Sequence, residues 1–249
     1  MKDEYRNISI VILAAGLGTR MRSKKAKVLN EIDAKPMIDY VVETAKMVHP
    51  NEIIVVIGNQ ANRVRSVVSK HGEIKFALQE KQLGTGHAVL CALPEVSLQS
   101  KHVLILCGDV PLIKYDTIKQ MIDNHLKLEK DLTLMTVDIE NPYGYGRIIV
   151  DEKGKVSRIV EEVDATENQR NIKSVNAGIY CINKEFLSDY LTKITSENKQ
   201  NEFYLTQMVE IGYKQNKSLG IFRCSDKKEI FGINSKEDLK VVENILLQR

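Results

Sequence analysis

Short apolar runs recur through the first half of the chain, and between them apolar residues return every three or four positions. The continuous runs are typical of strands buried on both faces, and the spaced pattern is typical of helices with one buried face. Their alternation predicts an α/β fold of the Rossmann-like kind, with a mixed, mostly parallel sheet flanked by helices. Strands are expected at residues 8–14, 53–57, 74–78, 103–107 and 132–137, and helices at 36–48, 60–70, 86–93 and 118–126.

The second half of the chain has a different pattern. Three predicted strands, at 147–150, 155–162 and 173–182, follow one another without long helices, which favours a small antiparallel lobe added to the sheet. Helices are expected at 184–194 and 204–214, a strand at 219–223, and a closing helix at 235–247 with Ser235 as its N-cap. We expect one domain over 1–249, with one lobe over about 1–138, a second over about 139–234, and the closing helix over 235–249.

The bulk composition narrows the class of protein. Of the 249 residues, 43% are hydrophobic, which is enough for one substantial core. The net charge is +3 and Lys and Arg form no dense stripe, so no nucleic-acid partner is expected. Neither a secretory leader nor an apolar run of membrane-spanning length is seen, so no membrane partner is expected. The cysteines form no C-x-x-C pair, which predicts free buried thiols in a reducing cytoplasm; they are Cys91, Cys107, Cys181 and Cys224.

A glycine-bearing loop follows the first predicted strand. Gly16 and Gly18 allow backbone N–H groups to approach a phosphate chain, and Arg20 and Lys27 can neutralise its charge. The loop is not a dinucleotide fingerprint, because Met21 stands where a third glycine is required. It is not a Walker A loop either, since no Gly-Lys-Ser/Thr follows. An ordinary strand-to-helix turn is the alternative interpretation.

An aspartate follows the predicted strand at 103–107. In open α/β sheets, ligands bind beyond the carboxyl ends of the strands, where Gly108 and Asp109 would lie. Mg²⁺ usually takes one or two protein oxygens and completes its shell with water and substrate phosphates, so Asp109 is a candidate metal ligand. The alternative is that Asp109 caps the turn before Pro111.

Two further runs are candidates for ligand binding. In the glycine-rich run 79–88, the amide of Gln79 offers a donor and an acceptor side by side, which complements the edge of uracil. Because an amide can flip, Gln79 alone does not exclude cytosine, and backbone groups near Gly84 must fix the choice. The alternative is a solvated loop residue, and His87 is interpreted as a helix-start histidine with no catalytic role. The run 143–147 is a turn whose glycines permit close approach of a ligand, although a plain hairpin turn would look similar.

These runs resemble a known family. The opening run is similar to the signature L-x-A-G-x-G-T-R-M, with a following lysine, of the sugar-1-phosphate nucleotidyltransferases, through Leu13, Ala15, Gly16, Gly18, Thr19, Arg20, Met21 and Lys27. Later motifs follow in family order: Gln-x-x-Gln-Leu-Gly-Thr-Gly-His-Ala, Gly-Asp-Val-Pro-Leu, Gly-Tyr-Gly-Arg-Ile, Ile-Val-Glu-Glu-x-Asp-Ala, Val-Asn-Ala-Gly-Ile-Tyr, Asn-Glu-Phe-Tyr-Leu-Thr and Gly-Ile-Asn. Together they resemble the uridyltransferase domain of the bacterial bifunctional enzymes that make UDP-N-acetylglucosamine.

The resemblance implies the nucleotide-diphospho-sugar transferase fold, with nucleotide bound by the first lobe and sugar by the second. Arg20, Lys27 and Asp109 would be the catalytic residues, and Asp109 and Asn234 would hold Mg²⁺. The other implied substrate-binding residues are Leu13, Ala14, Ala15, Gly16, Gln79, Gly84, Thr85 and Gly108 for the nucleotide side and Gly146, Glu161 and Asn176 for N-acetylglucosamine. Ala177 and Cys107 depart from the commonest pattern, where threonine and, in some relatives, tyrosine stand, and they bear on sugar selectivity.

The implied reaction is uridyl transfer from UTP to N-acetylglucosamine-1-phosphate, giving UDP-N-acetylglucosamine and pyrophosphate. Two alternatives are a related nucleotidyltransferase with another nucleotide or sugar phosphate, and a non-catalytic nucleotide-sugar-binding protein. The bifunctional enzymes of the family also carry a hexapeptide-repeat β-helix that acetylates and trimerises. No such repeat occurs in this sequence, so we expect no acetyltransferase activity and a monomer or loose dimer.

Overall fold

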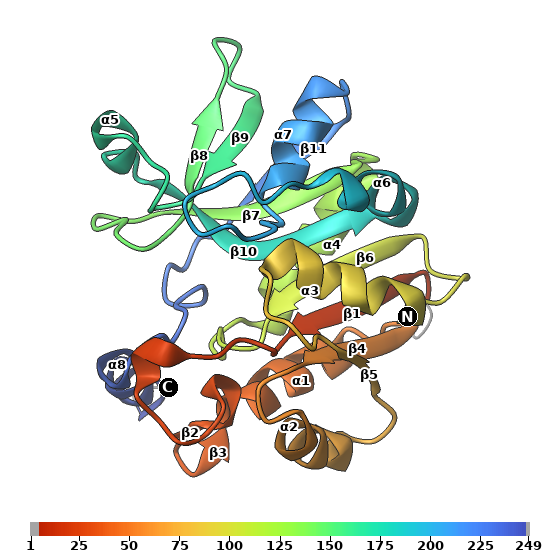
Figure 1. The fold of residues 1–249 in the computed structure, drawn as a ribbon. Coiled ribbons are helices and arrows are strands. Elements are labelled where there is room, and N and C mark those ends of the chain that lie inside the picture. The colour runs from red at the N-terminus through yellow and green to blue at the C-terminus, as the bar shows by residue number, and fades with distance from the viewer. Residues whose placement is uncertain (1–4, 248–249) are drawn as a thin grey trace.

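The computed structural model describes residues 5–247, and a nine-stranded sheet runs through them (Figure 1). The strand order along the main path is β11-β7-β10-β6-β1-β4-β5, with β8 and β9 branching from β10. The strands are β1 (Ile8–Leu13), β4 (Glu52–Ile57), β5 (Lys75–Leu78), β6 (His102–Cys107), β7 (Leu132–Asp138), β8 (Arg147–Val150), β9 (Val156–Val160), β10 (Ser174–Asn183) and β11 (Leu219–Arg223). The predicted strands are all present, within about two residues at either end.

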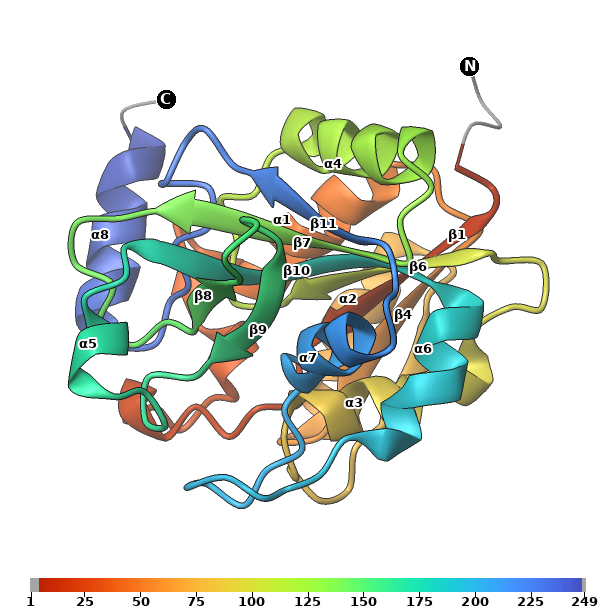
Figure 2. The same cartoon turned by 90° about the horizontal axis from the view of Figure 1, so that it is seen from above.

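Helices cover both faces of the sheet, as Figure 2 shows. Strand β1 illustrates why: Ile10 packs into the core on one face and Val11 into the core on the other, because side chains alternate along a strand. One face carries α1 (Met37–Met47), α2 (Ala61–Val68), α4 (Tyr115–Lys127) and α8 (Lys236–Leu247), and the other carries α3 (Thr85–Ala92), α6 (Lys184–Tyr190) and α7 (Gln207–Lys214). The predicted α/β fold with a flanked sheet is confirmed.

The sheet is parallel in its first half and mixed in its second. Strands β1, β4, β5 and β6 pair in parallel, whereas β10 pairs antiparallel with both β6 and β7. Strands β8 and β9 form an antiparallel pair that projects from the sheet (Figure 1). The predicted antiparallel addition is therefore present. The main sheet itself takes β10 and β11 from the second half of the chain, so the two predicted lobes share one sheet.

Several boundaries and small elements differ from expectation. The helix predicted at 204–214 begins only at Gln207, and those predicted at 184–194 and 60–70 end at Tyr190 and Val68, each followed by a 3₁₀ turn. A hairpin of β2 (Glu31–Ile32) and β3 (Lys35–Pro36) was not expected, because strands of two residues are too short to show a period. Its turn residues, Asp33 and Ala34, have φ of 49° and 59°.

The helix α5 (Glu167–Arg170) was also missed, although the sequence contained a signal for it. Thr166 accepts a hydrogen bond from the backbone N–H of Gln169, whose side chain accepts one from the N–H of Thr166. This reciprocal pair is a capping box, which a Thr-x-x-Gln spacing indicates. By contrast, the expected N-cap of the closing helix is confirmed, because Ser235 Oγ accepts from the N–H of Asp238 at 3.1 Å.

Candidate active site

The loops that follow β1 and β6 leave the sheet side by side. The two strands are parallel neighbours, with Leu13 opposite Cys107, so both end at the same edge of the sheet. The backbone N–H of Gly108 donates to the carbonyl of Leu13 at 2.9 Å, and that of Ala14 donates to the carbonyl of Val56. The predicted residues Leu13, Ala14, Ala15, Gly16, Gly108 and Asp109 are therefore brought to one edge, as the parallel pattern requires.

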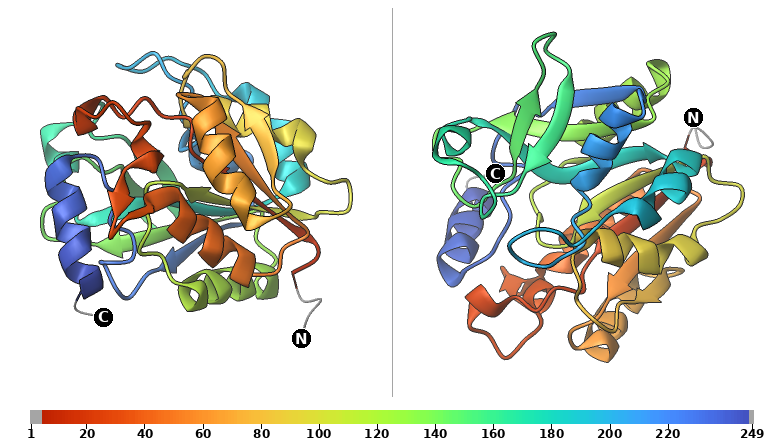
Figure 3. Two further views of the ribbon diagram at one scale, coloured as in Figure 1. Left: turned by 90° about the horizontal axis from the view of Figure 1, so that it is seen from below. Right: turned by 45° about the horizontal axis from the view of Figure 1, so that its top comes forward.

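Four predicted residues meet in what we call the charged cluster: Arg20, Lys27, Asp109 and Asn234. The Lys27 ammonium forms an ion pair with the Asp109 carboxylate and donates to Asn234 Oδ1 at 2.8 Å. Arg20 Nη2 donates to the same oxygen at 2.9 Å. Asn234 is held beside Asp109 because the neighbouring Ile233 N–H donates to the Asp109 carbonyl at 3.0 Å. Figure 3 shows the loop after β1 and the helix α8 on the same side of the molecule.

The two glycines of the opening loop serve different purposes. Gly18 has φ +64°, and a Cβ there would lie 2.6 Å from Lys27 Cβ, so this glycine lets the Lys27 stem pack against the loop. A Cβ on Gly16 would meet nothing within 4 Å. Of the two, Gly16 is thus the one whose backbone faces open space.

The oxygens of the charged cluster suit a hard divalent cation. Asp109 and Asn234 each direct one oxygen at the same ammonium group, so both oxygens face a single position. Carboxylate and amide oxygens are ligands of the kind that Mg²⁺ prefers. Over residues 5–247, no set of three or more His, Cys, Asp or Glu side chains could hold a metal ion. Asp109 and Asn234 supply two oxygens, and Mg²⁺ usually completes its shell with water and substrate phosphates.

Gln79 lies at the end of β5 and is buried, with 3% of its surface exposed, so the alternative of a solvated loop residue is wrong. Its Nε2 donates to the Gly84 carbonyl at 3.1 Å and lies 3.0 Å from His87 Nδ1. Since Gln79 supplies the donor, His87 Nδ1 is the acceptor of that contact. His87 thus has a role that the sequence did not indicate: it holds the Gln79 amide.

The loop around Gly84 is tied to a distant segment. Gly84 has φ +110°, and a Cβ there would come within 2.6 Å of the Phe203 carbonyl oxygen. Thr85 Oγ1 accepts from the Leu205 N–H at 3.0 Å. Gly84 and Thr85 are consequently held by the chain just before α7, which belongs to the second lobe.

The predicted residues of the second lobe, Gly146, Glu161 and Asn176, also gather. Together with Tyr180 and Thr206 they form what we call the second-lobe cluster. The Asn176 N–H donates to the Gly146 carbonyl at 2.9 Å, and a Cβ on Gly146 would lie 3.3 Å from Glu161 Oε2. Asn176 Nδ2 donates to the Tyr180 hydroxyl at 2.7 Å, and the Thr206 hydroxyl donates to Glu161 Oε1 at 3.0 Å. Tyr180 and Thr206 were not singled out from the sequence.

The surroundings of Glu161 raise the pKa of its carboxyl group. Withdrawal from water raises its pKa, and the nearby carboxylates of Asp164 and Glu202 raise it further. The hydrogen bond from Thr206 acts in the opposite direction without cancelling the effect. This cluster therefore combines amide, hydroxyl and carboxyl groups that can hydrogen-bond a ligand.

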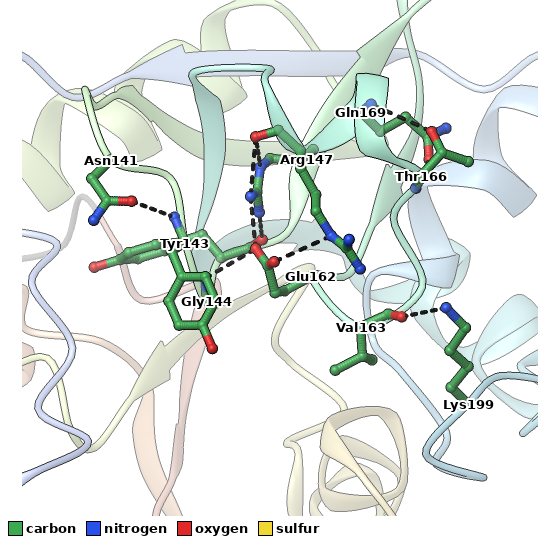
Figure 4. A network of polar contacts seen from close by, with 11 residues as sticks. Asn141, Tyr143, Gly144, Arg147, Glu162, Val163, Thr166, Gln169 and Lys199 are labelled. Carbon is green, nitrogen blue, oxygen red and sulfur yellow. Dashed lines mark hydrogen bonds and ion pairs between the residues drawn. The ribbon is translucent and has the colours of Figure 1, made fainter.

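A buried guanidinium supports the turn beside this cluster (Figure 4). Arg147, which is 1% exposed, forms an ion pair with Glu162 at 2.6 Å and donates to the carbonyls of Tyr145 and Arg170. Glu162 also accepts from the Gly144 N–H at 3.1 Å. Burial opposes ionisation of Glu162, but Arg147 and this N–H outweigh it and keep its pKa below the ordinary value. The network fixes the backbone at 144–147, and the sequence alone did not indicate that Arg147 is buried.

The thiols are free but not all buried. Cys181 and Cys224 are buried, whereas Cys91 and Cys107 are half-buried, which corrects the expectation for these two. Burial and the neighbouring Asp109 raise the pKa of Cys107 to about 12. Its Sγ donates to the Gly178 carbonyl at 3.3 Å. A thiol held in its neutral form beside the charged cluster is a poor nucleophile.

A hollow of about 1020 Å³ lies elsewhere on the molecule, between the β8–β9 turn, α7 and β11. Its lining includes Lys153, Lys155 and Lys217, and none of the predicted site residues lines it. The candidate site thus lies at the sheet edge and the second-lobe cluster, and not in this hollow.

Among the helices of residues 5–247, none has the length and apolar character needed to cross a bilayer.

Fold and site together define a class. A flanked, mostly parallel sheet with cations and an aspartate beyond the carboxyl ends of its strands is typical of α/β proteins that bind phosphorylated ligands at this edge. The family profile described as "Nucleotidyl transferase" matches residues 9–226, and the chain belongs to this family.

Individual relatives agree with that assignment. The chain is 47% identical over 242 residues to the bifunctional protein GlmU of Caldicellulosiruptor saccharolyticus, covering 97% of this chain and 52% of the relative. It is 41% identical over 247 residues to that of Geotalea uraniireducens, covering 98% and 53%. To that of Desulfotalea psychrophila it is 39% identical over 249 residues, covering 100% and 73%. The chain spans about half the length of the first two relatives.

Proposed function

We propose that this protein transfers a uridyl group from UTP to N-acetylglucosamine-1-phosphate, releasing pyrophosphate. The observation that carries the proposal is the charged cluster at the carboxyl edge of the sheet, next to the open backbone at Gly16. The close similarity to nucleotidyl transferases over almost the whole chain supports it. So does the order of motifs shared with the uridyltransferase domains.

In the proposed reaction, an oxygen of the sugar phosphate attacks the α-phosphorus of UTP. The bond between that phosphorus and the bridging oxygen of the leaving pyrophosphate breaks as the new phosphorus–oxygen bond forms. The attacking oxygen is already anionic near neutral pH, so no general base is needed. The proposed site accordingly has the cations Arg20 and Lys27 in place of a base. Burial raises the pKa of the nearby Cys107 thiol to about 12, so the thiol does not act as a base either.

Each part of the site has a proposed task. Arg20 and Lys27 hold the β- and γ-phosphates and stabilise the charge of the leaving group. Asp109 and Asn234 would hold Mg²⁺, which supplies charge neutralisation at the reacting phosphates when bound. Residues 13–16, Gly84, Thr85 and Gly108 line the nucleotide, and the buried Gln79 amide reads the base. Gly146, Glu161 and Asn176 bind the N-acetylglucosamine group.

Gln79 illustrates how the base can be read. Its Nε2 is committed to Gly84 and His87, so its Oε1 is directed away from those partners. An acceptor held in this orientation favours a base that presents an N–H, as uracil does at N3. Cytosine presents an acceptor at that position, which would face the oxygen of Gln79 unfavourably.

We propose that residues 1–138 bind the nucleotide and residues 139–234 bind the sugar, within one domain. We also propose that the chain works as a monomer or loose dimer, because the contacts within both clusters are made by residues of one chain. Four free thiols suit the reducing cytoplasm, where we place the reaction. Sedimentation over a range of concentrations, paired with rate measurements, tests the oligomeric state: specific activity that collapses on dilution contradicts it.

The test of the function is pyrophosphate release in the presence of Mg²⁺. UTP, CTP, ATP and GTP are each paired with N-acetylglucosamine-1-phosphate and with glucose-1-phosphate. We expect by far the fastest release from UTP with N-acetylglucosamine-1-phosphate. Faster release from another pair would instead indicate a related nucleotidyltransferase, and binding without release would indicate a nucleotide-sugar-binding protein.

A further inference from the structure

The two oxygens proposed as Mg²⁺ ligands already share a cation in this structure. The ammonium of Lys27 is bonded to both the Asp109 carboxylate and Asn234 Oδ1. A divalent ion that used both oxygens would need the position between them, which the ammonium takes. The lysine and the metal therefore compete for the same ligands.

The orientation of the two ligands is set by their other contacts. Asn234 Nδ2 donates to the Gly232 carbonyl at 3.3 Å, so Oδ1 is the atom that faces Lys27. The Asn234 N–H donates to Asp238 Oδ2 at 2.8 Å, which anchors the residue at the start of α8. The ligand pair is thus preformed, and the ammonium group is the part that must leave.

Lys27 is built so that only its end can move away. Its backbone begins a 3₁₀ turn, Lys27–Leu29, whose next two residues are buried. Its Cβ packs against Gly18, where no side chain intervenes. The remaining part of the stem has rotatable bonds, which allow the ammonium to swing toward another anion.

The local charge disfavours a divalent ion in the absence of substrate. Two cationic side chains, Arg20 and Lys27, both donate to Asn234 Oδ1, and Lys27 also pairs with the Asp109 carboxylate. An approaching metal ion is repelled by these two cations and must also displace an ammonium from an ion pair. A triphosphate reverses this balance, because it brings several negative charges to which both side chains can turn.

We infer that Lys27 is a place-holding cation: it blocks the metal ligands in the free protein and releases them when a phosphate chain draws its ammonium away. The inference rests on the proposed function, from which the metal ligands are taken. Metal and nucleotide binding are then positively coupled, and each strengthens the other by the same factor. The order of events is nucleotide first, with the metal settling on Asp109 and Asn234 afterwards.

The experiment measures Mn²⁺ binding to the full chain without nucleotide, by electron paramagnetic resonance of the free ion. Wild type is compared with Lys27→Met, which keeps the stem and removes the charge. We expect the dissociation constant of Lys27→Met for Mn²⁺ to be lower by about tenfold or more. The double variant Lys27→Met/Asp109→Asn is expected to lose this gain. Lys25→Met is the matched control, because Lys25 pairs with Glu31 and should leave Mn²⁺ binding unchanged.

A second measurement tests whether the Lys27 ammonium contributes to binding of the phosphate chain. UTP binding is measured by calorimetry in buffer containing EDTA, and Lys27→Met is expected to bind about tenfold more weakly than wild type. Circular dichroism checks the fold of every variant, and Lys27→Gln replaces Lys27→Met if the latter does not fold. Unchanged Mn²⁺ affinity in the folded, uncharged variant overturns the inference, and so does unchanged UTP affinity.

The pyrophosphate assay distinguishes failure of the inference about Lys27 from failure of the proposed function. If wild type releases pyrophosphate from UTP and N-acetylglucosamine-1-phosphate while Lys27→Met gains no Mn²⁺ affinity, only the place-holding role is wrong. If no nucleotide and sugar phosphate pair gives pyrophosphate, the proposed function is wrong and takes the inference with it.

Discussion

The charged cluster and the second-lobe cluster solve different chemical problems with different means. In the first, the cations Arg20 and Lys27 face Asp109 and Asn234, and Asn234 comes from far later in the sequence. In the second, the Glu161 carboxyl has a hydroxyl as its hydrogen-bond partner, and burial raises its pKa. The contrast teaches that two cations gather where phosphates would react, while amide and hydroxyl hydrogen bonds line the place proposed for the sugar.

The largest effect is expected from removing the charge of the proposed metal ligand, Asp109. Asp109→Asn should lower turnover on the order of a thousandfold, because a charged ligand at the reacting phosphates is lost while the shape is kept. Steady-state rates at saturating Mg²⁺, with circular dichroism as the check of folding, provide the measurement. Turnover close to wild type would show that the charged cluster is not the metal site.

Arg20→Ala should have the next largest effect, on the order of a hundredfold in turnover. Arg20 is expected to act most strongly as charge develops on the departing pyrophosphate, so the Michaelis constant for the sugar phosphate should change much less. Separate determination of kcat and KM tests this. A variant whose main defect is a raised KM for the sugar phosphate would place Arg20 with the second-lobe cluster instead.

Gly146→Ala tests the other side of the comparison. The added Cβ would lie 2.8 Å from Ile159 Cγ2 and 3.3 Å from Glu161 Oε2, so it intrudes on the second-lobe cluster. We expect KM for N-acetylglucosamine-1-phosphate to rise about tenfold, with little change in KM for UTP, since crowding here affects one substrate. Equal changes for both substrates would mean that the two clusters are not separate in function.

Glu161→Gln should have the smallest effect, which is a change in the free energy of unfolding. Because the folded-state pKa of Glu161 is raised above 4.5, its contribution to stability is complete below that value and is lost as pH rises through the folded-state pKa. The variant cannot ionise, so we expect it to be slightly more stable than wild type at neutral pH and equal to it near pH 4. Urea unfolding across this pH range measures the difference. A variant that is less stable at every pH would show that the ionised carboxylate is well stabilised.

Much of the fold could be predicted because its signals are local. Strands such as β1 and β4 are continuous apolar runs, and α1 shows its buried face in the spacing of Ile38, Val41 and Val42. The β2–β3 hairpin escaped prediction because its strands are two residues long. Helix α5 was missed although its Thr-x-x-Gln capping signal stood in the sequence.

The site was less accessible to such reasoning. Asp109 and the opening loop could be proposed from their places after strands, but the meeting of Lys27 with Asn234 joins residues 207 positions apart. No spacing rule reports such a contact, and Asn234 entered only through the family resemblance. Gln79 follows a strand and Arg147 begins one, and burial is the exception for both residue types, so their buried positions emerge only once packing is known.

The separation of 207 residues between Lys27 and Asn234 also determines when this contact can form during synthesis. A chain leaving the ribosome presents its amino-terminal strands first, and domains fold largely in that order. Strands β1, β4, β5 and β6 and most of their helices are complete long before Asn234 is made. The hydrogen bonds from Lys27 and Arg20 to Asn234 therefore form only after these strands have been made. A ribosome-bound chain that stops short of residue 234 contains every described strand of the sheet but lacks Asn234, so on the proposed assignment its charged cluster is incomplete.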